Sequence, residues 1–330
     1  MKNLARKAVL GSGLLRIAGH FRSCSAAILI YHSVMEDPRD QNAFLGGMGH
    51  SRHVFRGHME LLARRYHPAS LGQVRQFVRG EGELPDRSVA VTFDDGYTDN
   101  YEIAAPVLNE LGVPATFYAT VDCVEQRKLP WPGRLWFLFH NTKTGDWSDS
   151  SGKTWPLSSG VEREKAMLRS CDECCQLAGT EQEMYVARLA AELDTEVPAR
   201  SGALMMNYDQ LQALAGQGHI VGSHTMTHPN MAYVNPAAAR RELTESKLHL
   251  EQQLKRPVAH FSYPCPALSP HWTDQTVAAS RDAGYETGVT TDGGLARRGD
   301  DPLRMKRIRP TRTLEGLRWN LEYAFAGRLV

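Results

Sequence analysis

Short apolar runs alternate with amphipathic helical segments along most of this 330-residue chain. The apolar runs predict buried strands at residues 26–31, 88–93, 115–120, 219–223, 258–263 and 286–290. Helical patterns between them cover residues 55–66, 101–111, 208–216, 236–254 and 273–283. Strands that alternate with helices build parallel β-α-β units, so the expected fold class is α/β. With about six or seven strands, a closed barrel and an open sheet are both possible, because the pattern alone does not choose between them.

The strand-helix alternation lapses between residues 121 and 204. Two helical segments are predicted in the second half of this stretch, near residues 161–177 and 181–193. We interpret the stretch as an insertion on one face of the domain rather than as a separate domain. Its tryptophans are Trp131, Trp136, Trp147 and Trp155. Indole rings either stack on sugar rings or anchor such an insertion to the body, and the sequence favours neither role.

The first 24 residues are basic and mildly apolar. Their apolar run is too short to span a bilayer and is short and polar for the core of a signal peptide. The segment therefore predicts either a basic amphipathic helix on an anionic membrane surface or a first helix packed on the domain. We expect residues 1–24 to be this segment and residues 25–330 to be one domain with the insertion at about 121–204. The expected location is the cytoplasm or the inner membrane surface, rather than the periplasm or the medium.

The overall composition is that of an ordinary globular protein. Net charge is +1, so no nucleic-acid partner is expected. Among the six cysteines, the one cluster is Cys171, Cys174 and Cys175, and no second pair of similar spacing follows it. This pattern predicts reduced cysteines on a helix rather than a zinc site or a disulfide framework, which favours a reducing compartment.

Two adjacent carboxylates, Asp94 and Asp95, follow the predicted strand at residues 88–93. Side chains alternate along a strand, so the two carboxylates diverge unless the chain turns there, and Gly96 permits such a turn. Active sites of α/β folds gather where strands end in loops. A structural role is also open, because Asp-Gly is a common turn sequence and an aspartate can cap the following helix.

Two histidines, His224 and His228, follow the predicted strand at residues 219–223, and their i, i+4 spacing places them on one face if the segment turns helically. The hydroxyl residues Ser223, Thr225 and Thr227 could orient the imidazoles. One carboxylate and two imidazoles form an open ligand set for a divalent metal. The other carboxylate is then free to be a base for water that the metal activates, so the pattern predicts metal-assisted hydrolysis.

The segments Thr-Phe-Asp-Asp-Gly-Tyr (residues 92–97) and His-Thr-Met-Thr-His (residues 224–228) together resemble the polysaccharide deacetylase family, also called the NodB-homology or carbohydrate esterase 4 family. Weaker matches lie at residues 30–34, 261–264, 288–293 and 306–308. The resemblance implies that the domain of residues 25–330 is a distorted (β/α)7 barrel of NodB-homology type, with a helical insertion after an early strand. It also implies hydrolysis of an N-acetyl amide on an amino sugar.

By position in the motifs, the resemblance gives each site residue a role. Asp95, His224 and His228 are expected to bind one divalent metal ion, and Asp94 is expected to be the general base. The main-chain N–H of Cys265 falls where the family places an oxyanion donor. Zinc suits this ligand set best, and nickel, cobalt or iron would fit it too.

The chain departs from the family pattern in the segment that follows the predicted strand at 258–263. Many members have an arginine, which orients the base, where this chain has Ser262. Many also have Tyr-Gly where this chain has Cys265-Pro266. The tuning of the base is therefore expected to differ here.

The closing segment departs as well, because no histidine follows Leu303, where many members place the general acid. His32, at the end of the first predicted strand, is our substitute for that acid, and a structural histidine is the alternative. Arg307 and Arg309 either hold a substrate anion, such as a lipid-linked pyrophosphate or an acidic sugar, or are surface charges.

The leading hypothesis is a metal-dependent hydrolase of non-peptide C–N amide bonds that removes N-acetyl groups from a polysaccharide or glycan precursor. Its partner would be an N-acetylated glycan or glycolipid. A second hypothesis is a deformylase or deacetylase of a lipid-linked sugar at the inner membrane face, which the basic N-terminus keeps open. A third is a carbohydrate-binding protein without catalysis, which the intact residues Asp94, Asp95, His224 and His228 oppose.

Overall fold

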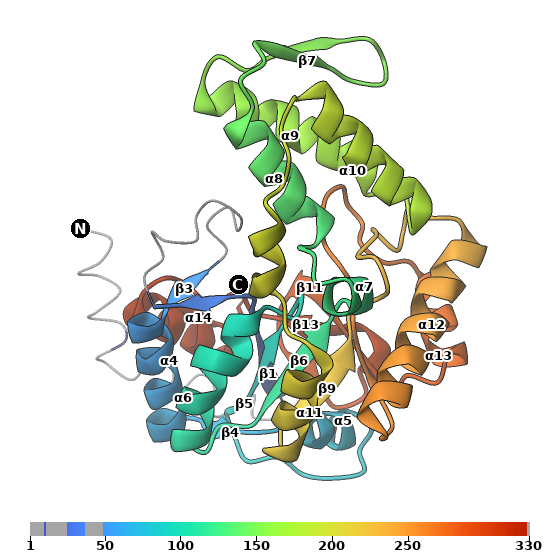
Figure 1. The fold of residues 1–330 in the computed structure, drawn as a ribbon. Coiled ribbons are helices and arrows are strands. Elements are labelled where there is room, and N and C mark those ends of the chain that lie inside the picture. Colours follow the sequence, from blue (N-terminus) through green and yellow to red (C-terminus); the bar gives the residue numbers. More distant parts are fainter. Residues whose placement is uncertain (1–9, 11–24, 37–48, 329–330) are drawn as a thin grey trace.

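The computed structural model describes residues 10, 25–36 and 49–328, and its core is a sheet wound into a nearly closed barrel (Figure 1). Seven parallel strands follow one another around it, and they are β1 (Ser25–Tyr31), β5 (Ser88–Phe93), β6 (Ala115–Ala119), β9 (Ile220–Ser223), β10 (His260–Ser262), β11 (Thr287–Gly293) and β13 (Met305–Arg307). A parallel bridge between Leu29 of β1 and Ile308 after β13 brings the two ends of the sheet together. The expected (β/α)7 barrel is confirmed, and the open sheet is excluded.

The predicted strands are apolar because both of their faces are covered. Every residue of β1 and β5 is buried, as expected for parallel strands between a barrel interior and a layer of helices. The barrel is distorted where pairing is sparse. β9 and β10 share only the Phe261–Ser223 register, and the register of β11 on β13 shifts between Val289 and Gly293. The seventh strand, β13, escaped prediction because Met-Lys-Arg is too short and too polar to look buried.

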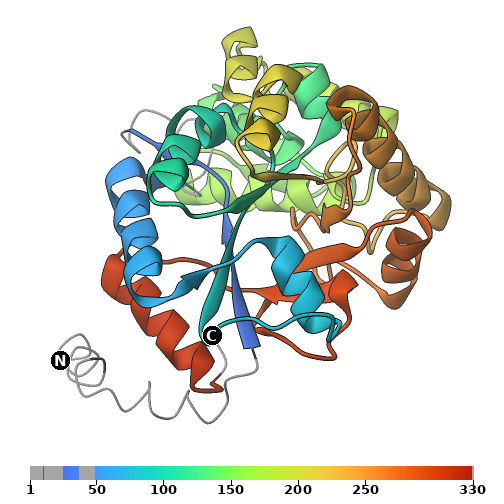
Figure 2. The same ribbon diagram turned by 90° about the horizontal axis from the view of Figure 1, so that it is seen from below.

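Helices surround the strands when the barrel is viewed along its axis (Figure 2). They are α4 (Arg52–Arg65), α5 (Leu71–Val78), α6 (Ala105–Glu110), α11 (Tyr208–Gly216), α12 (Pro236–Leu254), α13 (Asp274–Asp282) and α14 (Leu314–Phe325). Side chains at Ser51, Ser70, Asn207, Asn235, Thr273 and Thr313 accept hydrogen bonds from the first turns and so fix where these helices begin. The helix expected at residues 101–111 starts instead as a π-helical turn, η1 (Asn100–Ala104), before α6.

The short elements complete the barrel edges. β12 (Ala296–Arg297) pairs antiparallel with β1, and β4 (His67–Pro68) pairs with the start of β5. β2 (Val34–Met35) and β3 (His50–Ser51) form a separate two-stranded ribbon beside the end of β1. The 3-10 turn η3 (Pro302–Arg304) leads into β13.

The residues expected to be an insertion form a helical unit that stands on the barrel between β6 and β9 (Figure 1). Its elements are α7 (Val121–Glu125), α8 (Trp131–Asn141), the hairpin of β7 (Asp146–Ser148) and β8 (Thr154–Pro156), α9 (Gly160–Cys174), α10 (Thr180–Glu192) and η2 (Ala199–Leu204). The cysteines of α9 are buried free thiols, as predicted.

Three tryptophans of this unit donate indole hydrogen bonds to other parts of the protein. Trp131 and Trp147 are buried, and their indole N–H groups donate to the His228 carbonyl and to Glu192. The Trp155 indole donates to Asp149. The structure therefore supports the anchoring role for Trp131, whereas the hydrogen bonds of Trp147 and Trp155 stay within the insertion.

Of the N-terminal segment of residues 1–24, the structure describes only Leu10. This residue is buried, and its carbonyl accepts a hydrogen bond from Arg318 of α14. The remaining residues of the expected amphipathic segment lie outside the described part of the chain, so that interpretation and the expected location stay predictions. Among the described helices, none has the length and apolarity needed to cross a bilayer.

Candidate active site

A cavity of about 290 Å³ opens where the strands of the barrel end. Its walls come from the ends of β1 and β5, from residues 224–228, which we call the histidine loop, and from residues 309–312 after β13. The start of α8 adds Pro130, Pro132 and Gly133, so the insertion also contributes to this cavity. Most of the residues singled out in the sequence therefore meet at one edge of the barrel, as expected for the carboxyl ends of parallel strands.

The turn after β5 separates its two carboxylates. The Asp94 N–H still bonds to the Tyr31 carbonyl as if the strand continued, with an N···O distance of 3.0 Å. Asp95 and Gly96 then take positive φ angles of 77° and 91°. The turn favours glycine at position 96 for its φ angle, which L side chains rarely adopt, whereas a Cβ there would make only ordinary contact with Ala119 at 3.4 Å.

The histidine loop is not helical, which corrects the helical turn expected from the i, i+4 spacing. Thr225 and His228 instead have positive φ angles of 69° and 64°. The Thr225 hydroxyl accepts the His228 main-chain N–H at 3.0 Å, and the Ser223 hydroxyl accepts the Thr225 N–H at 3.3 Å. The sequence predicts that these hydroxyl groups orient the imidazoles. In the structure they accept main-chain N–H groups instead and so stabilise the conformation of the loop. Non-glycine residues in this conformation cost free energy and cluster at functional sites.

A carboxylate on α12 holds the tip of the histidine loop. Glu242 is buried and accepts the main-chain N–H groups of Met226 and Thr227 at 2.8 and 2.9 Å. It also accepts the Thr227 hydroxyl at 2.6 Å. The loop conformation is thus fixed by a long-range contact that the sequence pattern did not reveal.

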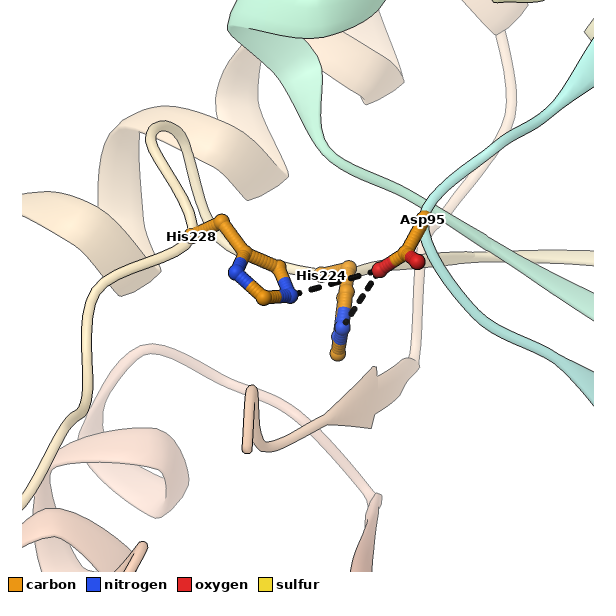
Figure 3. Close-up of side chains that lie close together, drawn as sticks. All are labelled: Asp95, His224 and His228. Atoms are coloured by element: carbon orange, nitrogen blue, oxygen red, sulfur yellow. Dashed lines mark ion pairs between the residues drawn. The ribbon is translucent and has the colours of Figure 1, made fainter. Parts of the chain in front are cut away.

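Asp95, His224 and His228 bring their polar atoms together in a buried cluster (Figure 3). The Asp95 Oδ1 lies 3.4 Å from the His224 Nε2 and 3.3 Å from the His228 Nε2. The His224 Nδ1 lies 2.8 Å from the Ser262 carbonyl, which fixes its N–H there and leaves Nε2 as the ligand atom. One carboxylate and two imidazole nitrogens so arranged fit a divalent metal ion.

Asp94 is not part of that cluster and forms a buried ion pair with Arg307 of β13. The two carboxylate oxygens accept from Nη1 at 2.8 Å and from Nη2 at 2.7 Å. Burial alone would raise the pKa of Asp94, but the Arg307 charge outweighs it and holds that pKa below its usual value. Arg307 is fully buried, so it is neither a surface charge nor a group that can meet a substrate anion, which corrects both interpretations.

Ser262 completes this pair. Its hydroxyl donates to Asp94 at 3.2 Å and accepts from Arg307 at 3.1 Å, while the Arg307 Nε donates to the Thr290 carbonyl. The family pattern places an arginine that orients the base at position 262, where this chain has serine. In this chain the guanidinium of Arg307, from β13, contacts the Asp94 carboxylate instead. The sequence contained Arg307 in a recognised closing segment, but only the closed barrel shows where its side chain goes.

His32 lies at the end of β1 and lines the cavity with Asp94 and Asp95. The Asn100 side chain, at the start of the π-helical turn, donates to the His32 carbonyl at 2.7 Å and so fixes its position. Burial lowers the pKa of His32, although the charges of Asp95 and Asp94 oppose this. The imidazole is thus neutral near pH 7 and could give up a proton only after it has taken one up in the cavity. Its role as general acid stays a prediction.

Cys265 also lines the cavity, and its thiol is 3.0 Å from the His271 Nε2. Burial raises the pKa of this thiol. The role of the Cys265 main-chain N–H as a hydrogen-bond donor to the oxyanion stays a prediction. Two further lining residues, His50 and Arg312, were not found from the sequence, because neither belongs to a motif.

A nearly closed parallel barrel with this carboxylate-imidazole cluster at its strand ends defines a NodB-type deacetylase fold. The family model for polysaccharide deacetylases matches residues 81–149 and 189–288, which together are just over half of the chain. The chain belongs to this family. The matched ranges contain Asp94, Asp95, His224 and His228, and the unmatched residues between them fall in the insertion.

Relatives and solved structures agree with this assignment. The chain is 21% identical over 294 residues to YxkH of Bacillus subtilis (strain 168), whose name assigns it to polysaccharide deacetylases, and the match covers 88% of this chain and 72% of that protein. It is 32% identical over 87 residues to the poly-β-1,6-N-acetyl-D-glucosamine N-deacetylase of Escherichia coli (strain K12). That second match covers 26% of this chain and only 12% of that enzyme.

Two solved structures share the fold. The deacetylase PplD of Streptococcus pyogenes, in complex with acetate, superimposes with a TM-score of 0.61 over 91% of this chain and 99% of that one. IcaB from Ammonifex degensii gives a TM-score of 0.59 over 91% and 98%. Both are 18% identical to this chain, so the likeness is one of fold.

Proposed function

We propose that this protein is a metal-dependent hydrolase that removes N-acetyl groups from the amino sugars of a polysaccharide or glycan precursor. The observation that carries the proposal is the buried cluster of Asp95, His224 and His228 beside Asp94, at the mouth of a barrel in a polysaccharide deacetylase. The E. coli relative acts on poly-β-1,6-N-acetyl-D-glucosamine, and we take that class of glycan as the first substrate to test.

Asp95, His224 and His228 would hold one divalent ion, and zinc is our first choice because it favours a small set of nitrogen and oxygen ligands. Nickel, cobalt and iron accept the same donors. When bound, the ion would supply Lewis acidity that polarises the amide carbonyl and lowers the pKa of water. The fixed His224 tautomer and the burial of all three side chains support this assignment.

Asp94 would take the proton of the attacking water. Its pKa is held low, so the group is a carboxylate throughout the neutral range. Each carboxylate oxygen has two lone pairs. Arg307 and the Ser262 hydroxyl use both on Oδ2, and Arg307 uses one on Oδ1, so one lone pair of Oδ1 remains for the water. His32, which is neutral at the start, would take up the proton that Asp94 has removed from the water and pass it to the departing amine, and the N–H of Cys265 would stabilise the oxyanion.

Acetate release tests the proposal. Purified protein loaded with zinc should release acetate and expose one amine per acetate from β-1,6-linked N-acetylglucosamine oligomers. In Asp94→Asn the metal content should stay near that of the wild type while hydrolysis falls by about two to four orders of magnitude, because the base is lost. Asp95→Asn should lose metal as well. No acetate from any N-acetylated glycan or glycolipid, with metal bound, would overturn the proposal and leave a deformylase or a carbohydrate-binding protein without catalysis.

A further inference from the structure

One tryptophan of the insertion, Trp136, has no role in a hydrophobic core. On the same helix, α8, the side chains of Trp131, Leu135 and Phe139 pack into the core of the insertion. Trp136 is only half-buried, and among the described residues it neither belongs to a hydrophobic cluster nor packs against one. The packing of the insertion therefore does not explain why an indole stands at this position.

His140 holds the Trp136 ring as a fixed platform. The two rings stack nearly in parallel, with centroids 4.0 Å apart and an interplanar angle of 11°. The His140 Nδ1 lies 2.8 Å from the Trp136 carbonyl, which fixes the imidazole in turn. One face of the indole is thus covered by the imidazole, and within the described part of the chain no second ring or cation stacks on the other face. A flat, fixed apolar ring of this kind offers a surface on which a ligand can stack.

Trp136 and His140 lie on the side of α8 that lines the active-site cavity. The helix leads from the barrel mouth into the insertion, and its first turn contributes Pro132 and Gly133 to the cavity wall (Figure 1). Residues three or four apart share one face of a helix, so Gly133, Trp136 and His140 follow one another along a single stripe. At about 1.5 Å per residue, Trp136 is about 5 Å and His140 about 10 Å farther along the axis than Gly133. The stripe therefore continues the cavity wall outwards along the insertion.

The cavity itself is small. Its volume of about 290 Å³ is at the lower limit of sites for small molecules, so it holds little more than one sugar with its acetamide group. The neighbouring sugars of a glycan then lie outside the cavity, where the stripe on α8 is within their reach. The C–H bonds on one side of a pyranose ring make that side apolar, and an indole is the largest aromatic surface that a side chain can offer to it.

We propose that Trp136, supported by His140, forms an aromatic subsite that stacks on a sugar ring next to the one whose N-acetyl group is hydrolysed. The imidazole fixes the indole, and the opposite face of the indole receives the sugar. This inference rests on the proposed function, and it narrows the substrate to a glycan of two or more sugar units, as opposed to a single lipid-linked sugar.

Binding of sugars of increasing length to the full-length, zinc-loaded protein tests the subsite. The probes are methyl glucoside and the β-1,6-linked disaccharide and tetrasaccharide of glucose. They share the pyranose ring of N-acetylglucosamine, on which stacking depends, and they carry no amide to hydrolyse. Calorimetry should give a dissociation constant for the tetrasaccharide about tenfold lower than for methyl glucoside, the size expected of one aromatic stacking contact.

Variants separate stacking from other effects of chain length. Trp136→Ala should remove most of the tenfold gain and leave methyl glucoside binding unchanged, whereas Trp136→Phe keeps a flat ring and should restore part of the gain. Trp319→Ala is the matched control. Trp319 is also half-buried and stacked on the ring four residues later, Tyr323, but no residue of its fully described helix, α14, lines the cavity. Melting temperatures check that the variants fold.

Two results would overturn the subsite. One is a tetrasaccharide that binds the wild type no more tightly than methyl glucoside does, and the other is a preference for length that is as large in Trp136→Ala as in the wild type. Acetate release from N-acetylated glycans is measured separately. If the preference for length depends on Trp136 but no such glycan is hydrolysed, the proposed reaction is wrong while the subsite stands.

Discussion

At the scale of single residues, the ion pair of Asp94 and Arg307 sets the chemistry of the site. Both side chains are buried, and Arg307 is also tied to Ser262 and to the Thr290 carbonyl. A buried pair of this kind is costly to break, because one uncompensated charge remains and costs about 3–5 kcal/mol. The pair therefore fixes the carboxylate in place, and we infer that Arg307 is a positioning residue for the base.

Replacing Arg307 should lower the rate without removing the metal. In Arg307→Gln, kcat should fall about 10- to 100-fold, since charge-assisted hydrogen bonds to Asp94 are lost, while KM changes little because Arg307 does not line the cavity. Arg307→Lys keeps the charge and should recover part of kcat. Steady-state kinetics and metal analysis of both variants check this. A rise in KM alone, with kcat unchanged, would contradict the positioning role.

His32 is the second residue whose role can be isolated. The amine must leave with a proton, and His32 lines the cavity close to both carboxylates. We expect His32→Ala to keep its metal and to lose about two to four orders of magnitude in rate, with partial rescue by added imidazole. Acetate assays with and without imidazole test this. Full activity in His32→Ala would return the residue to a structural role and leave the acid unidentified.

At the scale of secondary-structure elements, α12 supports the site from outside the barrel mouth. Its Glu242 is the acceptor for three donors at the tip of the histidine loop, and the positive φ angle of His228 depends on that loop conformation. On the other side, the indole of Trp131 in α8 donates to the His228 carbonyl. One histidine ligand is thus held between a barrel helix and the insertion.

Removing the Glu242 carboxylate should therefore weaken metal binding. Glu242→Ala leaves three donors without an acceptor, and the loop should relax, lowering zinc affinity about 10- to 100-fold, as is typical when groups that support metal ligands are lost. Glu245→Ala, an exposed carboxylate on the same helix, is the matched control. Competition with a chelator of known affinity measures the effect. Equal zinc affinity in the two variants would show that the loop keeps its shape without Glu242.

At the scale of the whole molecule, buried neutral histidines link stability to pH. His58 of α4 is fully buried, and its Nδ1 pairs with the Tyr31 hydroxyl at 3.1 Å. Burial, with a smaller effect of His50, lowers the pKa of His58 to about 4. In the unfolded chain this pKa returns to about 6.5, so protons bind the unfolded state first as the pH falls.

The contribution of His58 to stability is therefore complete above pH 6.5 and is lost as the pH falls towards 4. That loss is about 3 kcal/mol of unfolding free energy by pH 4. In His58→Gln the part of the pH dependence that comes from His58 should vanish. The difference in unfolding free energy between wild type and variant should therefore become smaller as the pH falls from 6.5 to 4. His53→Gln, an exposed histidine on the same helix, is the control. Urea unfolding between pH 4 and 7.5 measures both, and a constant difference would contradict the prediction.

The sequence by itself determined the features that depend on neighbouring residues. Apolar runs and helical periodicity located six of the seven barrel strands and the helices α11, α12 and α13 to within about three residues, because burial and capping leave a local pattern. The order of polar residues after two of those strands also identified Asp94, Asp95, His224 and His228. Parallel strands that end at one edge bring such residues together whatever the details of the fold.

Only the tertiary structure decided what depends on contacts between distant residues. The barrel closes through Leu29 and Ile308, and this closure brings Arg307 onto Asp94, 213 positions earlier in the chain. It also folds the histidine loop into a non-helical form around Glu242. The physical reason is that periodicity records which side of an element is buried, whereas the direction of a buried charge is set by partners that no local pattern contains.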